Sequence, residues 1–533
     1  MTHRFQKLSG VLIIVVLLFT CSRSDAQLNA EIQKHAAKNQ LLSDYYKARN
    51  FNPVWGPGHL SELARFLRSL ETHGLSPNLF QLNVWEPYWL NPNPDPKVQA
   101  SVEVSTTHLA LFAIQALAYG FVDPTEVHPK WKAIKRAVTA SQFLDAAFQQ
   151  PVGQFAAYLL DKVPPQDSRY SDMVKTLARY REIQSYGGWK PLPDPGRPIG
   201  PGIPYKDLDL LKARLQAERD LPTAPQARNR KKIFEQLTSD ALKSFQFRHG
   251  IDPDGYIGPN TLKEINIPTH ERINTLIINL DRIRWLPRAY EQAEHVEVNI
   301  AESALRVYNR RQRVTTMEVI VGVKGKHQTP VFHGNIQFLT FRPYWNVPTT
   351  IARKELVPEA LKGDPVSYMQ ENNYEIVPYF EVAPEKALPV TVENLNKVSA
   401  GGLFMRQGTG PKNALGLVKF IFPNDNSVYL HDTPNRNLFK MADRDLSHGC
   451  VRVSRPDELA HIILQRNPEN WNLNAVRAAM EDAGNPNNKV HLSEPLPVYL
   501  MYWTSFIMGD GRVRFDEDIY GHDVVMKQRF GLR

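Results

Sequence analysis

Cysteine is scarce in this chain, since only Cys21 and Cys450 occur among 533 residues. A count this low excludes a scaffold held together by disulfides. The chain also lacks a large excess of either charge. It has 64 lysines and arginines against 55 aspartates and glutamates, which gives a net charge of +9. Spread over so long a chain, that excess indicates mild attraction to anionic surfaces and excludes a nucleic-acid-binding protein.

Long apolar runs are also missing beyond the amino terminus, where no stretch reaches the ~20 residues of a membrane-spanning helix. What is present is typical of a soluble globular protein. Hydrophobic residues make up 42% and charged residues 22%, which excludes a largely disordered chain. At the usual domain size, the length predicts about three or four domains.

Residues 1–26 have the pattern of a secretory signal peptide. Arg4 and Lys7 belong to a basic start, and residues 11–19 form an unbroken run of nine apolar residues. Such a run suits a signal peptide and is too short to span a bilayer. Residues 24–26 read Ser-Asp-Ala, a candidate cleavage site.

Two other interpretations of this segment stay open. Residues 18–21 resemble a lipoprotein signal that ends before Cys21, which would carry the lipid, and an uncleaved membrane anchor is the third interpretation. All three export the rest of the chain to the periplasm or cell envelope, and in the two that include processing no transmembrane span remains. If Cys21 is removed, Cys450 is the lone thiol of the exported protein and cannot form an internal disulfide.

The first half of the chain reads as helical. Residues 27–185 have apolar positions at helical spacing and predict a scaffold without a catalytic cluster. Residues 186–205 are rich in proline and glycine and predict a linker. A compact three-helix unit is expected over 206–268, and a connecting helix over 269–292.

The period changes to two near residue 295, so residues 293–480 predict a mostly-β domain. Helical and irregular sequence interrupts it at 351–412, long enough for an inserted lid subdomain. Further strands at 481–533 are expected to complete this region. The expected fold is therefore α+β and multidomain.

The chemistry concentrates in a segment where His431 ends a strand and Cys450 follows in Ser-His-Gly-Cys-Val-Arg, residues 447–452. A cysteine nucleophile needs a base for its proton and donors for an oxyanion. His431 and His448 are candidate bases, Arg452 is a nearby positive charge, and the backbone N–H groups of Gly449 and Cys450 are candidate oxyanion donors.

Two non-catalytic interpretations compete with this one. Cys450 could be a small buried core residue, although an apolar core position is a poor place for this polar motif. Alternatively, His431, Asp432, His448 and Cys450 could bind zinc. The spacing lacks the paired cysteines or histidines of most zinc sites, so we predict no metal.

These motifs resemble the L,D-transpeptidases with a YkuD-type catalytic domain. The resemblance extends to the YcbB-like subfamily, through TFRPYWNVPTTIARKELVP, MRQGTGPKNALGLVKFIFPNDNSVYLHDTP and the closing PVYLMYWTSFIMGDGRVRFDEDIYGHD. The segment ALKSFQFRHGIDPDGYIGPNTLKEIN resembles a peptidoglycan-binding domain, and YYKARNFNPVW and THGLSP resemble the helical scaffold of the same subfamily. Nearly the whole exported chain is covered in order.

The resemblance implies a role for each residue of the motif. Cys450 would be the nucleophile, His431 the general base and then acid, and the Gly449 backbone part of the oxyanion hole. His448 would be an auxiliary group, and Arg452 would either brace its loop or bind a substrate carboxylate. In this family a backbone carbonyl often orients the histidine. Three further residues would line the substrate groove: Tyr344, Trp345 and Asn346.

The resemblance also implies the reaction and its partners. A peptidoglycan tetrapeptide stem would acylate Cys450 with release of D-alanine, and a second stem would accept the acyl group in a 3→3 crosslink. No cofactor is needed. Peptidoglycan peptides and glycan would be the partners, and carbapenem-type β-lactams would be covalent inhibitors. A carboxypeptidase or hydrolase that trims stems, and a non-catalytic wall-binding protein, remain as alternatives.

Overall fold

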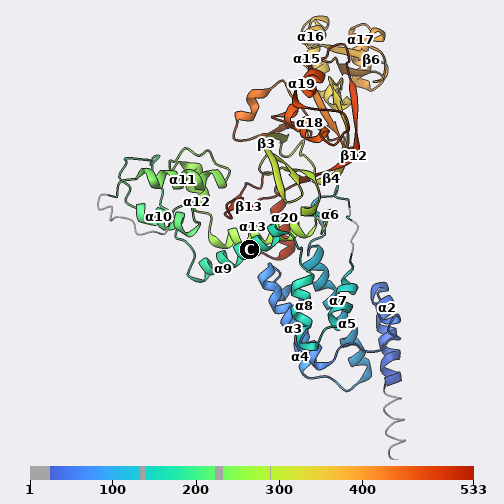
Figure 1. Cartoon of the computed structure of the whole chain (residues 1–533), viewed down its shortest axis with the longest axis vertical. Coiled ribbons are helices and arrows are strands. Elements are labelled where there is room, and N and C mark those ends of the chain that lie inside the picture. Colours follow the sequence, from blue (N-terminus) through green and yellow to red (C-terminus); the bar gives the residue numbers. More distant parts are fainter. Residues whose placement is uncertain (1–24, 133, 135–137, 223–231, 289, 533) are drawn as a thin grey trace, which may run out of the picture.

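The computed structural model describes residues 25–132, 134, 138–222, 232–288 and 290–532. The molecule is elongated, with a helical domain at one end and a sheet topped by a small lid at the other (Figure 1). A small helical unit lies to one side of the middle. The predicted signal peptide, with Cys21, lies outside the described residues up to position 24. The expected α+β multidomain fold is confirmed.

The amino-terminal domain is built of helices, and several of them begin at a residue whose side chain caps the first turn. The longest, α5 (Pro96–Tyr119), begins with proline after Asp95, whose carboxylate accepts from the N–H of Lys97. The other helices and short 3₁₀ turns are α2 (Gln40–Lys47), α3 (Pro57–Ser69), η1 (Leu70–His73), η2 (Pro77–Phe80), α4 (Leu82–Leu90), α6 (Pro124–Val127), α7 (Ala140–Phe148), η3 (Val152–Gln154), α8 (Phe155–Lys162) and α9 (Ser168–Ser185).

The described residues of the small unit form three helices and a core of their own. They are α10 (Leu208–Ala217), α11 (Gln236–Arg248) and α12 (Pro259–Ile265). The proline- and glycine-rich segment before them has no helix, yet Leu192, Ile199 and Tyr205 are buried in the same core. This segment is therefore part of the unit, because its apolar side chains pack in the same core as those of the helices.

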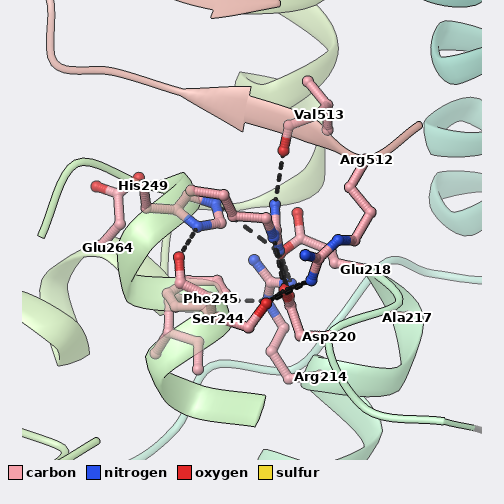
Figure 2. Close-up of polar contacts among 12 residues, drawn as sticks. Arg214, Ala217, Glu218, Asp220, Ser244, Phe245, His249, Glu264, Arg512 and Val513 are labelled. Atoms are coloured by element: carbon pink, nitrogen blue, oxygen red, sulfur yellow. Dashed lines mark hydrogen bonds and ion pairs between the residues drawn. The ribbon is translucent and has the colours of Figure 1, made fainter. Parts of the chain in front are cut away.

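A buried ion-pair network joins this unit to the carboxyl-terminal hairpin, β13 (Ser505–Ile507) and β14 (Val513–Phe515) (Figure 2). Arg248 is fully buried and donates to Glu218 at 2.6 Å, to Asp220 at 2.9 Å and to the carbonyl oxygen of Val513 at 3.1 Å. Arg512 donates to Asp220 at 3.0 Å from the hairpin side. The unit is thus attached to the carboxyl-terminal half of the chain by charge-assisted hydrogen bonds as well as by the connecting backbone.

We refer to the nine-stranded sheet as the main sheet, with strand order β10-β3-β11-β9-β8-β4-β12-β1-β2. β3 also pairs with β2, so the two ends of the sheet meet. Its strands are β1 (His295–Asn299), β2 (Ala304–Asn309), β3 (Gln312–Gly322), β4 (Phe332–Phe341), β8 (Val418–Ile421), β9 (Leu430–His431), β10 (Asp445–Ser447), β11 (Val451–Val453) and β12 (Asn488–Met501).

β12 lies between β1 and β4, although it is the last of these strands in the chain. It is parallel to β1, with Val296 opposite Val498, and antiparallel to β4, with Thr340 opposite Lys489. The main sheet therefore requires residues beyond 480. The remaining elements around it are η4 (Tyr290–Gln292), η7 (Arg436–Lys440), α13 (Thr269–Arg284), α18 (Pro456–Leu464), α19 (Leu473–Glu481) and α20 (His522–Phe530).

The insertion between β4 and β8 forms the lid, a subdomain with its own core that includes Val357, Met369 and Leu395. A three-stranded sheet, ordered β5-β7-β6, was not foreseen from the sequence. The lid elements are β5 (Trp345–Asn346), α14 (Thr349–Ile351), a π-helix η5 (Ala352–Leu356), α15 (Val357–Ala360), α16 (Pro365–Glu371), β6 (Tyr374–Val377), η6 (Pro384–Lys386), α17 (Val392–Ala400) and β7 (Phe404–Gln407). No described helix combines the length and apolar character needed to cross a bilayer.

Candidate active site

Two short parallel strands place the histidine and cysteine of the motif on one face of the main sheet. In the register of β9 and β11, Leu430 is opposite Val451 and His431 is opposite Arg452. Side chains alternate along a strand, so the fully buried Leu430 and Val451 point into the core, and His431 and Arg452 lie on the other face. Cys450 directly precedes β11 and lies two residues before Arg452, so its side chain is on the same face as His431 and Arg452.

The Cys450 side chain lies beside Tyr429 and the backbone of Ser427. Its Sγ is 3.6 Å from the Ser427 carbonyl oxygen. Burial raises the pKa of the Cys450 thiol, while hydrogen bonding to Tyr429 and the charge of Arg452 oppose that rise only in part. Tyr429 also has a raised pKa, through burial and then the neighbouring thiol, so its hydroxyl stays a donor. The sequence interpretation missed Tyr429, although its position two residues before His431 was the available signal.

His431 is buried, 5% exposed, and its Nδ1 lies 2.5 Å from the carbonyl oxygen of Asp432. A carbonyl oxygen can only accept, so Nδ1 carries the proton and Nε2 is left free to take one. Burial, followed by the charge of Arg452, lowers the pKa of His431 to about 3. The ring is therefore neutral at neutral pH, as a general base must be.

The carboxylate of Asp432 serves the backbone and not the histidine ring. It accepts from the N–H of Leu417 at 2.8 Å and of Thr433 at 2.6 Å, and it pairs with Arg436. Asp432 thus fixes the start of the long loop that leads to Cys450, while its carbonyl oxygen orients His431.

The glycine before the cysteine has a left-handed backbone, with φ of 111° at Gly449, which a side chain would strain. Its N–H donates to the Ser447 hydroxyl at 3.1 Å, and the same hydroxyl donates to the Cys450 carbonyl oxygen at 2.6 Å. In this arrangement the Gly449 N–H, predicted to face an oxyanion, is already engaged. Among the described residues, the Cys450 N–H has no hydrogen-bond partner and is the open backbone donor.

His448 contacts the lid instead of the thiol. Its Nε2 is 2.9 Å from Oε1 of Glu355, which lies in the π-helix of the lid, and its ring is 4.7 Å from that of His327. Both members of the His448–Glu355 pair are more than 40% exposed, so the pair contributes little to stability. The lid therefore touches the cysteine loop directly, a contact between segments about 90 residues apart that no local sequence pattern predicts.

Arg452 has no carboxylate partner among the described residues, so it forms no salt bridge of its own that would brace its loop. Its charge lies near Cys450 and His431. Lys419 of β8, directly opposite His431, is a second cation on the same face. Lys419 was not among the sequence-predicted site residues, because strand register alone places it there.

The three predicted groove residues lie at the base of the lid. Trp345 packs into the lid core and Tyr344 stacks under Arg406, with 4.4 Å from guanidinium to ring centre. Asn346 is exposed and pairs with β7. None of the three has a described hydrogen bond or ring contact with the Cys450 motif, so core packing of the lid accounts for Trp345.

The described residues contain no cluster of histidine, cysteine and carboxylate side chains arranged to hold a metal ion. His431 uses Nδ1 on a carbonyl and Asp432 points its carboxylate into the backbone. The site is thus a thiol, a neutral imidazole, two cations and hydrogen-bond donors, a set suited to acyl transfer.

We expect alkylation of Cys450 to be slow at neutral pH and to rise continuously up to about pH 9 and beyond. The reason is that the raised thiol pKa and lowered imidazole pKa leave both groups uncharged in the resting protein. The measurement is the rate of iodoacetamide labelling against pH by intact mass, with a Cys450→Ala variant as the blank. A plateau of reactivity beginning at about pH 6, typical of a thiolate–imidazolium pair, would contradict this expectation.

Comparison with known families divides the chain into three parts. Residues 40–177 match a family described as "Scaffold domain", residues 205–265 match "Putative peptidoglycan binding domain", and residues 293–471 match "L,D-transpeptidase catalytic domain". The last match contains both His431 and Cys450.

A "Putative L,D-transpeptidase" from Haemophilus influenzae is 33% identical over 266 residues, 48% of this chain and 50% of that protein. The match thus spans about half the length of this curated relative. Crystal structures of L,D-transpeptidases from Stackebrandtia nassauensis and Xylanimonas cellulosilytica are each 14% identical and cover 58% of this chain, and 97% and 100% of their own. Their TM-scores are 0.21 and 0.16.

Proposed function

The chain carries a YkuD-type L,D-transpeptidase catalytic domain, and we propose that it crosslinks peptidoglycan through a thioester on Cys450. The observation that supports this most directly is the register of β9 and β11. It sets a neutral, carbonyl-oriented His431 on the same face as the thiol of Cys450. This pairing is what nucleophilic catalysis by cysteine requires.

In the first half of the proposed reaction, Nε2 of His431 takes the thiol proton as Sγ attacks the carbonyl carbon of the third stem residue. The oxyanion would accept hydrogen bonds from the Cys450 N–H and the Tyr429 hydroxyl. Collapse of this intermediate breaks the peptide bond, and His431 returns its proton to the amine of the departing D-alanine. A thioester remains on Cys450.

In the second half, an amine on the diamino acid of another stem attacks the thioester. His431 takes a proton from that amine and returns it to the sulfur, giving a 3→3 crosslink and the resting enzyme. Water in place of the amine would release a tripeptide. The lid, which meets the cysteine loop at Glu355 and His448, would exclude water and favour the amine.

The other domains fit the same role. Residues 205–265 match a peptidoglycan-binding family, so we assign this unit to the wall polymer, where it would raise the local concentration of stems. Such a substrate lies outside the cytoplasm, in keeping with the predicted export signal. Periplasmic location, a lipid on Cys21 and acylation of Cys450 by carbapenem-type β-lactams belong to this proposal.

The test is the product spectrum of purified protein incubated with a disaccharide tetrapeptide. We expect free D-alanine and, by mass spectrometry, a dimer joined between two third-position residues. Tripeptide as the sole product would instead make the protein a carboxypeptidase on the same scaffold. Intact substrate after long incubation, with no acyl adduct on Cys450, would reduce the chain to a wall-binding protein.

A further inference from the structure

A row of basic side chains crosses the main sheet on the face that carries the reactive pair. Arg452 is opposite His431, His431 is opposite Lys419, Lys419 is opposite Thr340, and Thr340 is opposite Lys489. Residues directly opposite each other on neighbouring strands project to the same face. The row therefore runs without a break from β11 to β12, with His431 between two cations.

The two cations beside His431, Lys419 and Arg452, are not balanced by a neighbouring carboxylate in the described part of the chain. Among the described residues, neither Lys419 nor Arg452 forms a hydrogen bond or an ion pair with a carboxylate. Lys419 is mostly buried, and its burial, followed by the charge of Lys489, lowers its pKa to about 8. A buried cation without a partner is costly to keep, so a site of this kind points to an anion from outside.

A third group in the row also lacks a partner. The side chain of Thr340 is 0% exposed, and its hydroxyl has no hydrogen-bond partner in the structure. Buried hydroxyl groups are nearly always satisfied, so an unsatisfied one next to Lys419 calls for an explanation. An anion bound by the cations would supply the missing acceptor.

We propose that Lys419 and Arg452, with the Thr340 hydroxyl, bind the terminal carboxylate of the donor stem. This inference rests on the proposed function, and it names the part of the substrate that the row recognises. The departing residue must present its amine to Nε2 of His431, which protonates it. Its carboxylate is only two bonds from that amine.

The spacing of the sheet fits this assignment. Neighbouring strands lie about 4.8 Å apart, so Lys419 and Arg452 project from the two strands on either side of His431. Both side chains can therefore reach a carboxylate that is two bonds from the leaving amine. A stem with one more residue would carry its carboxylate beyond both cations. The row would thus select stems that end one residue after the acylated carbonyl.

The test compares two donors, a tetrapeptide with a free terminal carboxylate and the same peptide with a terminal amide. For the full-length wild type we expect kcat/KM to favour the acid by about tenfold or more, as for a lost charge-assisted hydrogen bond. In Lys419→Gln the ratio of the acid rate to the amide rate should fall to about one, and a thermal unfolding midpoint close to that of the wild type shows that the variant is folded. Lys419→Arg should restore the preference, and the matched Lys489→Gln, at the far end of the row, should keep it.

Equal use of acid and amide by the wild type would overturn the inference, and so would an undiminished preference in Lys419→Gln. The diamino acid of the stem can carry a second carboxylate, on its side chain. A third donor in which this side-chain carboxylate is amidated shows whether the row binds it instead of the terminal carboxylate. Loss of turnover with this donor alone would assign the row to that other carboxylate and overturn the inference. If the wild type acylates Cys450 with none of the donors, the proposed function fails together with it.

Discussion

Replacing Cys450 with alanine is expected to lower D-alanine release from a tetrapeptide stem by at least about a thousandfold, because no other side chain at the site can form the acyl intermediate. Among the described residues the sulfur has weak hydrogen-bonding contacts, with the Ser427 carbonyl oxygen and with Tyr429, so the free energy of unfolding should change by less than about 1 kcal/mol. The measurement is a D-alanine release assay beside thermal unfolding of both proteins.

Two companion variants separate the nucleophile from its surroundings. His431→Ala should slow turnover by about 10²–10⁴-fold, the range for loss of a general base. Tyr429→Phe keeps the ring and removes only the hydroxyl, so its smaller loss measures the contribution of that donor to the oxyanion. Turnover by Cys450→Ala within tenfold of the wild type would place the chemistry on another residue.

The second large effect is on stability. Arg248→Met is expected to lower the local free energy of opening around α10 and α11 by about 3–5 kcal/mol, as when one partner of a buried ion pair is removed. Without the guanidinium, the buried carboxylates of Glu218 and Asp220 lose their shared donor, and the Val513 carbonyl loses its hydrogen bond across the interface. Amide hydrogen exchange in these helices reports that free energy directly.

Arg512→Met is the matched control. Its side chain is 24% exposed and approaches Asp220 from the hairpin side, so water can replace some of the hydrogen bonds that Arg512 donates. We expect a loss of about 1 kcal/mol there. Equal protection of α11 in wild type and Arg248→Met would mean that the network does not stabilise the small unit. Opening of that unit without loss of catalytic activity on soluble stems would show that it is an independent module.

The sequence was sufficient for features encoded locally. Helical periodicity predicted the first domain, and the motif around Cys450 identified the candidate nucleophile and the histidine. It was not sufficient where strand register decides. Lys419 and Tyr429 share a face with the thiol only because β8, β9 and β11 pair as they do, and one residue of slip would turn them into the core.

Other features depend on contacts between distant segments. Tyr344 and Trp345 contact lid residues, and their place in the substrate groove stays a prediction. The hydrogen bond from the Gly449 N–H to Ser447 depends on a hydroxyl rotamer that no sequence pattern fixes. The roles of Cys450, His431, His448 and Arg452 remain predictions that the variants above can test.

The place of β12 has a consequence for the timing of activity. A polypeptide that crosses a membrane amino terminus first delivers β1 and β4 early, but the gap between them stays open until residues 488–501 follow. Pairings this distant in sequence form late, because the intervening chain must be closed into a loop first. We expect the site around the thiol to remain unassembled during export, so that the protein begins to work only once β12 has arrived.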